Sequence, residues 1–150
     1  TPAQIGKGIT VWTESVGVSS FQHEQTKLLL ESLGRQIFVD DEKYLDMATA
    51  LSGSGPAYVF LFIEALVEAG VNIGFSRTVA EELVYTTIKG SLDYAMNSSK
   101  NLSDLRTQVT SPGGTTEAAL RCLEAGEFRT IVSDAVSAAY QRSIDLGKNS

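Results

Sequence analysis

The sequence predicts a mainly α-helical protein that opens with the end of an α/β domain, and three observations lead to this prediction. Residues 8–13 alternate in polarity and carry β-branched side chains, as strands do. Residues 35–39, with the apolar residues 37–39 in a row, indicate a second short strand. After Asp41 the apolar patterns have helical spacing. Because one β-α-β unit is too small to fold alone, we expect residues 1–40 to be a terminal remnant of an α/β domain. Residues 41–150 would form an all-helical domain.

A helix is expected between the two strands. Ser19 followed by Gln22 makes a plausible capping box, and the pattern after it predicts a helix over residues 21–33. Gly34 is well placed to end this helix. Its inner side would carry three leucines, Leu29, Leu30 and Leu33.

Six helices are expected in the second part. The spacing predicts helices over residues 42–51, 57–69, 78–97, 102–109 and 127–146, and one more that begins behind Gly113 and Gly114. Residues 52–56 read Ser-Gly-Ser-Gly-Pro and predict a sharp interruption. Thr78 with Glu81 offers a capping box, and Leu83 and Leu92 would face inward from the helix that follows.

The helix over residues 57–69 is apolar on nearly every side, relieved only by Glu64 and Glu68 on one face. A helix of this kind must be enclosed by others, and in so short a chain a second subunit can supply the cover. We therefore expect a homodimer. The longest apolar run, residues 58–63, ends at Glu64 and is too short to span a bilayer, so no membrane partner is expected.

Composition excludes several classes of function. The net charge of −6 disfavours nucleic-acid binding through phosphate neutralisation. Cys122 is the only cysteine, so an intrachain disulfide and a cysteine-based zinc site are excluded, which indicates a reducing, cytoplasmic setting. Cys122 itself is expected to be a small buried residue in a helix. The chain opens at Thr1 without an initiator methionine, and we expect it to be a piece of a longer protein.

Conventional catalytic sets are missing from the sequence. His23 is the only histidine and is expected at the surface, so neither a Ser-His-Asp triad nor a Cys-His pair is indicated. The acidic pairs, such as Asp40 with Asp41, are explained by solvated faces, and no metal site is expected. Residues 52–58 do not match the G-x-G-x-x-G pattern and lack the strand that this dinucleotide fingerprint needs before it.

One stretch, residues 107–117, has a pattern that chemistry could use. Ser111 and Pro112 break the preceding helix, and two glycines then lead into an apolar helical pattern. The free N–H groups and positive dipole end of such a helix can hold a carboxylate or a phosphate. The alternative is an ordinary helix start capped by Ser111 or a threonine. Ser111, Thr115 and Thr116 supply only neutral donors, so such a site could hold an anionic substrate while another molecule supplies the chemistry, as cofactors often do.

The sequence resembles the pyrroline-5-carboxylate reductase family along essentially its whole length. The resemblance rests on Thr1-Pro2-Ala3, on residues 46–60 (Asp-Met-Ala-Thr-Ala-Leu-Ser-Gly-Ser-Gly-Pro-Ala-Tyr-Val-Phe), on Glu64-Ala65 and on residues 108–116 (Gln-Val-Thr-Ser-Pro-Gly-Gly-Thr-Thr). It implies a Rossmann domain for NADPH or NADH, of which residues 1–40 would be the last part, and a helical dimerisation domain over residues 41–150. It also implies a homodimer that can assemble further into a decamer.

The resemblance implies a site as well. The carboxylate of a cyclic imino acid, 1-pyrroline-5-carboxylate, would lie on backbone N–H groups around Gly114, Thr115 and Thr116, with Ser111 assisting. Thr116 would be the catalytic side chain, because its hydroxyl occupies the position of the family threonine that hydrogen-bonds the ring nitrogen. Thr1 and Pro2 would lie near the cofactor.

One departure from the family pattern concerns residues 99–102, which read Ser-Lys-Asn-Leu where relatives often carry an acidic segment, so no acidic contact is expected from them. Two alternatives remain open. The chain could be a non-catalytic helical dimerisation module, or a related β-hydroxyacid dehydrogenase-type domain, although the catalytic lysine of such enzymes has no counterpart here. Without the cofactor-binding half the chain alone is expected to be inactive.

Overall fold

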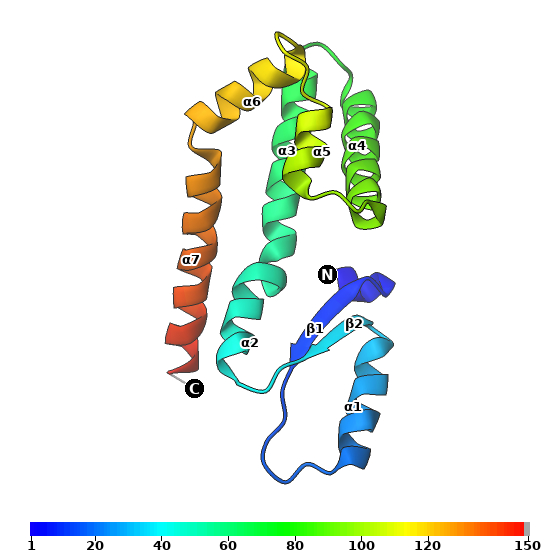
Figure 1. Ribbon diagram of the computed structural model, residues 1–150, viewed down its shortest axis with the longest axis vertical. Coiled ribbons are helices and arrows are strands. Elements are labelled where there is room, and N and C mark those ends of the chain that lie inside the picture. The colour runs from blue at the N-terminus through cyan, green and yellow to red at the C-terminus, as the bar shows by residue number, and fades with distance from the viewer. Residues whose placement is uncertain (149–150) are drawn as a thin grey trace. The chain divides into compact units, whose positions relative to one another are not determined.

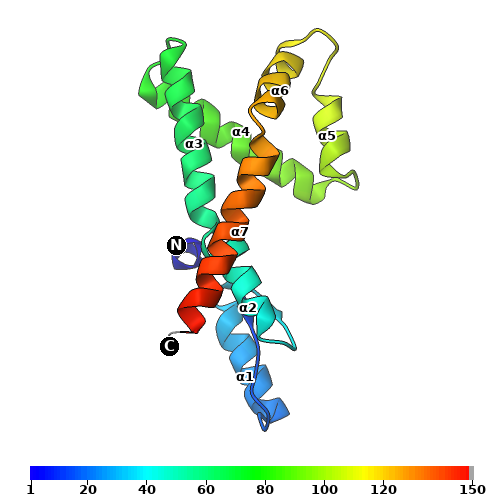
Figure 2. The same cartoon turned by 90° about the vertical axis from the view of Figure 1, so that its left-hand side faces the viewer.

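The computed structural model describes residues 1–148 (Figures 1 and 2). Its elements are η1 (Pro2–Ile5), β1 (Gly8–Trp12), α1 (Ser20–Glu31), β2 (Gly34–Phe38), α2 (Lys43–Ala48), η2 (Thr49–Gly53), α3 (Gly55–Asn72), α4 (Arg77–Asn97), α5 (Leu102–Gln108), α6 (Thr115–Ala125) and α7 (Phe128–Gly147). This order confirms the predicted class, a β-α-β segment followed by helices. The chain forms two compact units, the first from residues 1–58 with α7 from Ser133 onward, and the second from residues 59–132.

The first unit contains the sheet. Strands β1 and β2 pair in parallel, with Gly8 opposite Gly34 and Trp12 opposite Phe38 (Figure 1). Trp12 is the buried residue of β1, and its indole N–H donates to the Gln36 side chain over 2.7 Å. The end of α7 is tied to α2, because the Ser143 hydroxyl hydrogen-bonds Asp46 over 2.6 Å.

Helix α1 begins as the sequence predicts, but the side expected to be buried is largely exposed within this chain. The Ser19 and Gln22 capping box is present, with each side chain bonded to the other residue's backbone. Of the leucines expected inside, Leu29 and Leu33 are exposed, so that prediction is wrong for the single chain. The helix ends at Glu31, and Gly34 opens β2 instead of ending the helix.

The predicted interruption at residues 52–56 is much milder than expected. Helix α2 continues into one π-helical segment, η2, whose wide turn is closed by the Ser54 N–H donating to the Thr49 carbonyl over 2.8 Å. Helix α3 follows directly, so helix runs almost without a break over Lys43–Asn72. By length and composition alone this helix could cross a membrane, although core helices of soluble proteins meet the same criteria.

In the second unit α3 and α4 approach closely. A Cβ built on Gly70 would lie 3.0 Å from the Cβ of Ala80, which is itself buried. The predicted capping box at Thr78 is wrong: Ser76 caps α4, and its hydroxyl accepts the Val79 N–H over 3.4 Å. Ser76 is the cap because it lies directly before the helix with an extended backbone, whereas Thr78 already lies in the first helical turn.

The apolar faces of the helices are mostly uncovered within this chain. Val67 is the buried residue of α3, whereas Leu61 is 67% exposed. In α4, Leu83 and Leu92 were expected to face inward and are exposed. The other large apolar side chains left exposed on α3 and α4 are Val59, Phe60, Phe62, Leu66, Val79, Tyr85, Tyr94 and Met96. A monomer with this surface would be poorly stabilised, which favours a second molecule as the missing cover.

Candidate functional site

The loop between α5 and α6 is a tight turn built around two glycines. Gly113 has φ +71°, a left-handed conformation that favours glycine. The Gly114 N–H donates to the Ser111 carbonyl over 3.0 Å and closes the turn. The Ser111 hydroxyl lies so near that a Cβ built on Gly114 would be 2.5 Å from its oxygen. The loop therefore holds the Ser111 side chain against the start of α6.

Helix α6 starts without a side-chain cap. Its N-cap is Gly114, whose carbonyl accepts the Ala118 N–H over 3.2 Å as the first helical bond. Neither Ser111 nor a threonine caps the helix, so the ordinary capped start that the sequence left open is not what forms. Within residues 1–148 no protein acceptor takes the N–H groups of Thr115 and Thr116. Two donors at the positive end of a helix are thus free for an anion.

The two threonines differ in their surroundings. Thr115 is exposed, and Thr116 is partly buried. No acceptor or donor among residues 1–148 engages the Thr116 hydroxyl, which leaves it available to a ligand. The structure thus brings together Ser111, Gly114, Thr115 and Thr116, the residues that the sequence predicts for substrate binding.

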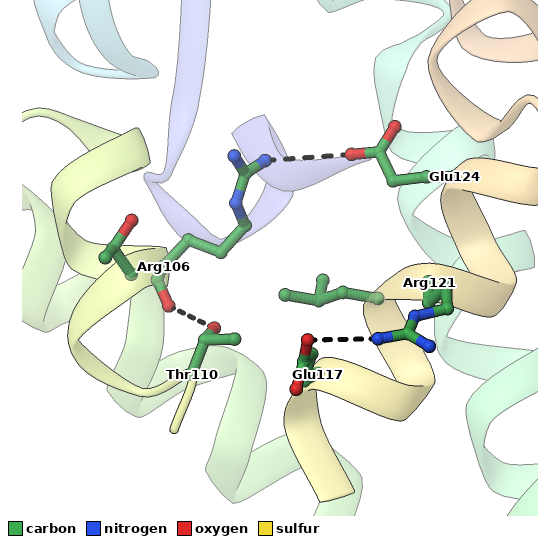
Figure 3. A pocket seen from close by; sticks show the side chains of 7 residues that line it. Arg106, Thr110, Glu117, Arg121 and Glu124 are labelled. Carbon is green, nitrogen blue, oxygen red and sulfur yellow. Dashed lines mark hydrogen bonds and ion pairs between the residues drawn. The ribbon is translucent and has the colours of Figure 1, made fainter. Parts of the chain in front are cut away.

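Glu117 is a residue of this loop that the sequence reasoning missed. One of its carboxylate oxygens, Oε2, accepts the Gly113 N–H over 2.6 Å, and the other, Oε1, pairs with Arg121 at 3.0 Å (Figure 3). An acidic residue in the first turn of a helix is a common stabilising feature. That pattern could have pointed to Glu117, but the contact with Gly113 depends on the shape of the turn.

A shallow hollow of about 360 Å³ lies beside the loop and is lined by residues of α5, of α6 and of the segment between them (Figure 3). The Arg106 guanidinium of α5 lies 3.9 Å from the Glu124 carboxylate of α6. The backbone carbonyl of Arg106 accepts a hydrogen bond from the Thr110 hydroxyl over 2.6 Å. Glu124 also accepts hydrogen bonds from Arg129, the shortest of them 2.9 Å. The Arg129 guanidinium lowers the pKa of the Glu124 carboxyl, with a smaller contribution from Arg106. The charges lining the hollow are therefore paired with one another.

The residues expected near the cofactor belong to the first unit. Thr1 precedes η1 and its carbonyl accepts the Gln4 N–H over 3.1 Å, while the Pro2 carbonyl accepts the Lys7 N–H over 3.0 Å. The region around Ser52 and Tyr58 is also in the first unit. The Tyr58 hydroxyl donates to the Ala50 carbonyl over 3.1 Å, which ties the start of α3 to η2.

Two other predicted residues take different surroundings from those expected, and a third, Asp41, keeps its solvated position. His23 is partly buried: its ring packs near Trp12 and Phe38, and its Nδ1 lies 2.8 Å from Glu14. Cys122 is exposed on α6, so the expected burial is wrong for the single chain. Asp41 pairs with Lys43 at 2.8 Å, and the hydrogen bond from Lys43 lowers the pKa of its carboxyl. Among the described residues no group of three metal-ligating side chains occurs.

The fold and the loop together define a class, a helical domain with apolar faces open for pairing and an anion-compatible helix start, preceded by a parallel β-α-β unit. The model of one family, described as pyrroline-5-carboxylate reductase dimerisation, matches residues 42–146. The chain belongs to the pyrroline-5-carboxylate reductase family.

Individual relatives agree with the family match. The chain is 41% identical over 148 residues to a pyrroline-5-carboxylate reductase of Pseudomonas aeruginosa, covering 99% of this chain and 54% of the relative. It is 40% identical over 149 residues to the enzyme of Arabidopsis thaliana, with the same coverage. A crystal structure of the Plasmodium falciparum pyrroline carboxylate reductase with NADP bound matches with a TM-score of 0.94 at 38% identity, over 97% of this chain and 58% of that one. The chain thus spans about half the length of the relatives that it matches.

Proposed function

We propose that this chain supplies the dimerisation and substrate-binding part of an enzyme that reduces 1-pyrroline-5-carboxylate to L-proline with NADPH or NADH. The observation that carries the proposal is the uncapped start of α6, where the amides of Thr115 and Thr116 are free beside the Ser111 hydroxyl. This arrangement suits the carboxylate of a small imino acid. The family membership of the chain supports the same substrate.

Each loop residue would have a distinct task in the reaction. The amides of Thr115 and Thr116 would bind the substrate carboxylate, with the Ser111 hydroxyl as a further donor. The Thr116 hydroxyl would hydrogen-bond the ring nitrogen and guide a proton to it as the C=N bond becomes a C–N bond. The cofactor supplies the hydride that the imine carbon receives. The protein's role is then to orient the ring and polarise the C=N bond.

The described residues fit only a minor part of a nicotinamide cofactor. No G-x-G-x-x-G unit follows a strand in residues 1–148, and the glycines at residues 53 and 55 lie within helix. Thr1 and Pro2 remain candidates for a contact near the nicotinamide. We propose that the pyrophosphate of NADPH or NADH is bound by a separate nucleotide-binding part.

The exposed apolar faces of α3 and α4 support a homodimer as the functional form, and assembly of dimers into a decamer is proposed as its extension. The apolar helix over Lys43–Asn72 would then be covered by the second copy and not by lipid, because Glu64 and Glu68 interrupt it. The single cysteine and the metabolic substrate support a cytoplasmic location.

The test is a steady-state assay of the full-length protein. The wild type should oxidise NADPH or NADH only when pyrroline-5-carboxylate is added. Thr116→Ala should lower kcat/KM, because the lost hydroxyl hydrogen bond is worth about 1–3 kcal/mol, a factor of roughly 5 to 150. Thr115→Ala is the matched control and should change kcat/KM little, because only its backbone N–H is used. Unchanged kcat and KM in Thr116→Ala would remove that side chain from the mechanism.

A further inference from the structure

Both glycines of the α5–α6 loop have their N–H groups occupied from within the protein. The Gly114 N–H donates to the Ser111 carbonyl over 3.0 Å, and the Gly113 N–H donates to Glu117 Oε2 over 2.6 Å. The second bond is the shorter one, and its acceptor is a charged side chain that reaches back from the first turn of α6. The free backbone donors at the start of α6 therefore begin at Thr115.

The carboxylate of Glu117 is itself held in place. Arg121, one helical turn further along α6, donates to its other oxygen, Oε1, over 3.0 Å. Only 37% of the Glu117 side chain is exposed, against 77% for Arg121. The pairing restricts the Glu117 rotamer and offsets the negative charge next to a site proposed for an anion.

We propose that Glu117 is a positioning residue for the substrate carboxylate, acting through the Gly113 N–H. By holding Gly113 in its left-handed conformation, it fixes the turn that aims the Thr115 and Thr116 amides at one point. It also removes the Gly113 N–H as a competing donor, so the carboxylate has one place to bind. This inference rests on the proposed function, because it assigns a role within that site.

A purely structural role predicts a different result. If Glu117 only stabilised the start of α6, its removal would reduce the fraction of folded enzyme, so kcat would fall while KM stayed constant. A positioning role instead raises KM for pyrroline-5-carboxylate and leaves KM for the nicotinamide cofactor unchanged. Measuring kcat and both KM values on the same preparation separates these possibilities.

The experiment compares Glu117→Ala and Glu117→Gln with wild type in the full-length enzyme. The alanine variant removes the acceptor, and we expect KM for pyrroline-5-carboxylate to rise about tenfold, which corresponds to ~1.4 kcal/mol. The glutamine variant keeps an amide oxygen that can accept the Gly113 N–H, so its KM should stay within about threefold of wild type. Glu82→Ala, at an exposed glutamate of α4, is the control and should leave both KM values unchanged.

Two results would overturn the inference. One is an alanine variant with wild-type KM for pyrroline-5-carboxylate. The other is a glutamine variant as impaired as the alanine variant, because that would assign the effect to charge and not to the hydrogen bond. Failure of the proposed function is distinguishable from both, since the wild type itself would then show no turnover of pyrroline-5-carboxylate.

Discussion

The closest packing in the α5–α6 loop can be tested by a double-mutant cycle on Gly114 and Ser111. A Cβ at Gly114 would lie 2.5 Å from the Ser111 hydroxyl oxygen and 3.0 Å from its carbonyl oxygen, both inside the 3.4 Å at which ordinary contacts begin. Gly114 has φ −83°, which alanine adopts without strain, so crowding is the main unfavourable effect. We expect Gly114→Ala to lower the free energy of unfolding by about 1–3 kcal/mol.

The cycle separates the crowding caused by the Ser111 hydroxyl from the crowding caused by the Ser111 carbonyl. Ser111→Ala removes the nearer of the two atoms, and Gly114→Ala should then cost about 1 kcal/mol less than in the wild-type background. The entropic gain of replacing glycine in the unfolded chain is common to both backgrounds and cancels. Urea unfolding measures all four proteins at one fixed protomer concentration, because the stability of a dimer depends on concentration. Equal costs in both backgrounds, within about 0.5 kcal/mol, would refute the described loop geometry.

Three further predictions concern a cap, an interface and an ion pair. Ser76→Ala should lower the free energy of unfolding by about 1 kcal/mol through loss of the α4 cap, whereas Thr78→Ala should change it by less than about 0.5 kcal/mol; the reverse order would contradict the assigned cap. Leu61→Lys should shift the protein from dimer to monomer in analytical ultracentrifugation, because this exposed side chain lies on the apolar face of α3; a dimer as tight as wild type would place the interface elsewhere. Arg129→Gln should raise the NMR-measured pKa of Glu124 toward its ordinary value of 4.5, because Arg129 is the main cause of the lowering; an unchanged pKa would count against the pair. In the wild type this contribution to stability is complete above the unfolded-state pKa and is lost as the pH falls through the lowered folded-state pKa.

Much of the fold follows from local patterns in the sequence. The two strands, the cap at Ser19 and the end of α4 at Asn97 lie where the sequence predicts, because each depends on residues within a few positions of one another. The cap of α4 was misplaced because Thr78 with Glu81 matches the capping-box pattern, whereas the true cap at Ser76 lacks the acidic partner. Which of two hydroxyl residues two positions apart becomes the cap depends on the backbone conformation at the start of the helix, and a sequence pattern does not specify that conformation.

Burial was the weakest part of the prediction. The sequence shows that Leu29 and Leu83 lie on apolar faces, but not which molecule covers those faces, and both are exposed in the single chain. His23 was expected at the surface and is partly buried instead, because it contacts Glu14 and Trp12 from a different segment. Contacts between distant segments leave little trace in a single sequence.

The local structure of the candidate site was predicted in part, and its role toward a substrate stays a prediction. The Ser-Pro-Gly-Gly-Thr-Thr run showed that α6 starts behind two glycines, and the absence of a side-chain cap there agrees with anion binding. That a glutamate would bind the Gly113 N–H could not be foreseen, because this bond requires the left-handed turn to form first. The roles of Ser111 and Thr116 toward a substrate stay predictions.

The most direct test of the account is a crystal structure of the full-length protein with L-proline and the oxidised nicotinamide cofactor bound. The account predicts the proline carboxylate about 3 Å from the backbone nitrogens of Thr115 and Thr116, with the ring nitrogen within hydrogen-bonding distance of the Thr116 hydroxyl. Proline bound elsewhere, with the start of α6 empty, would contradict it.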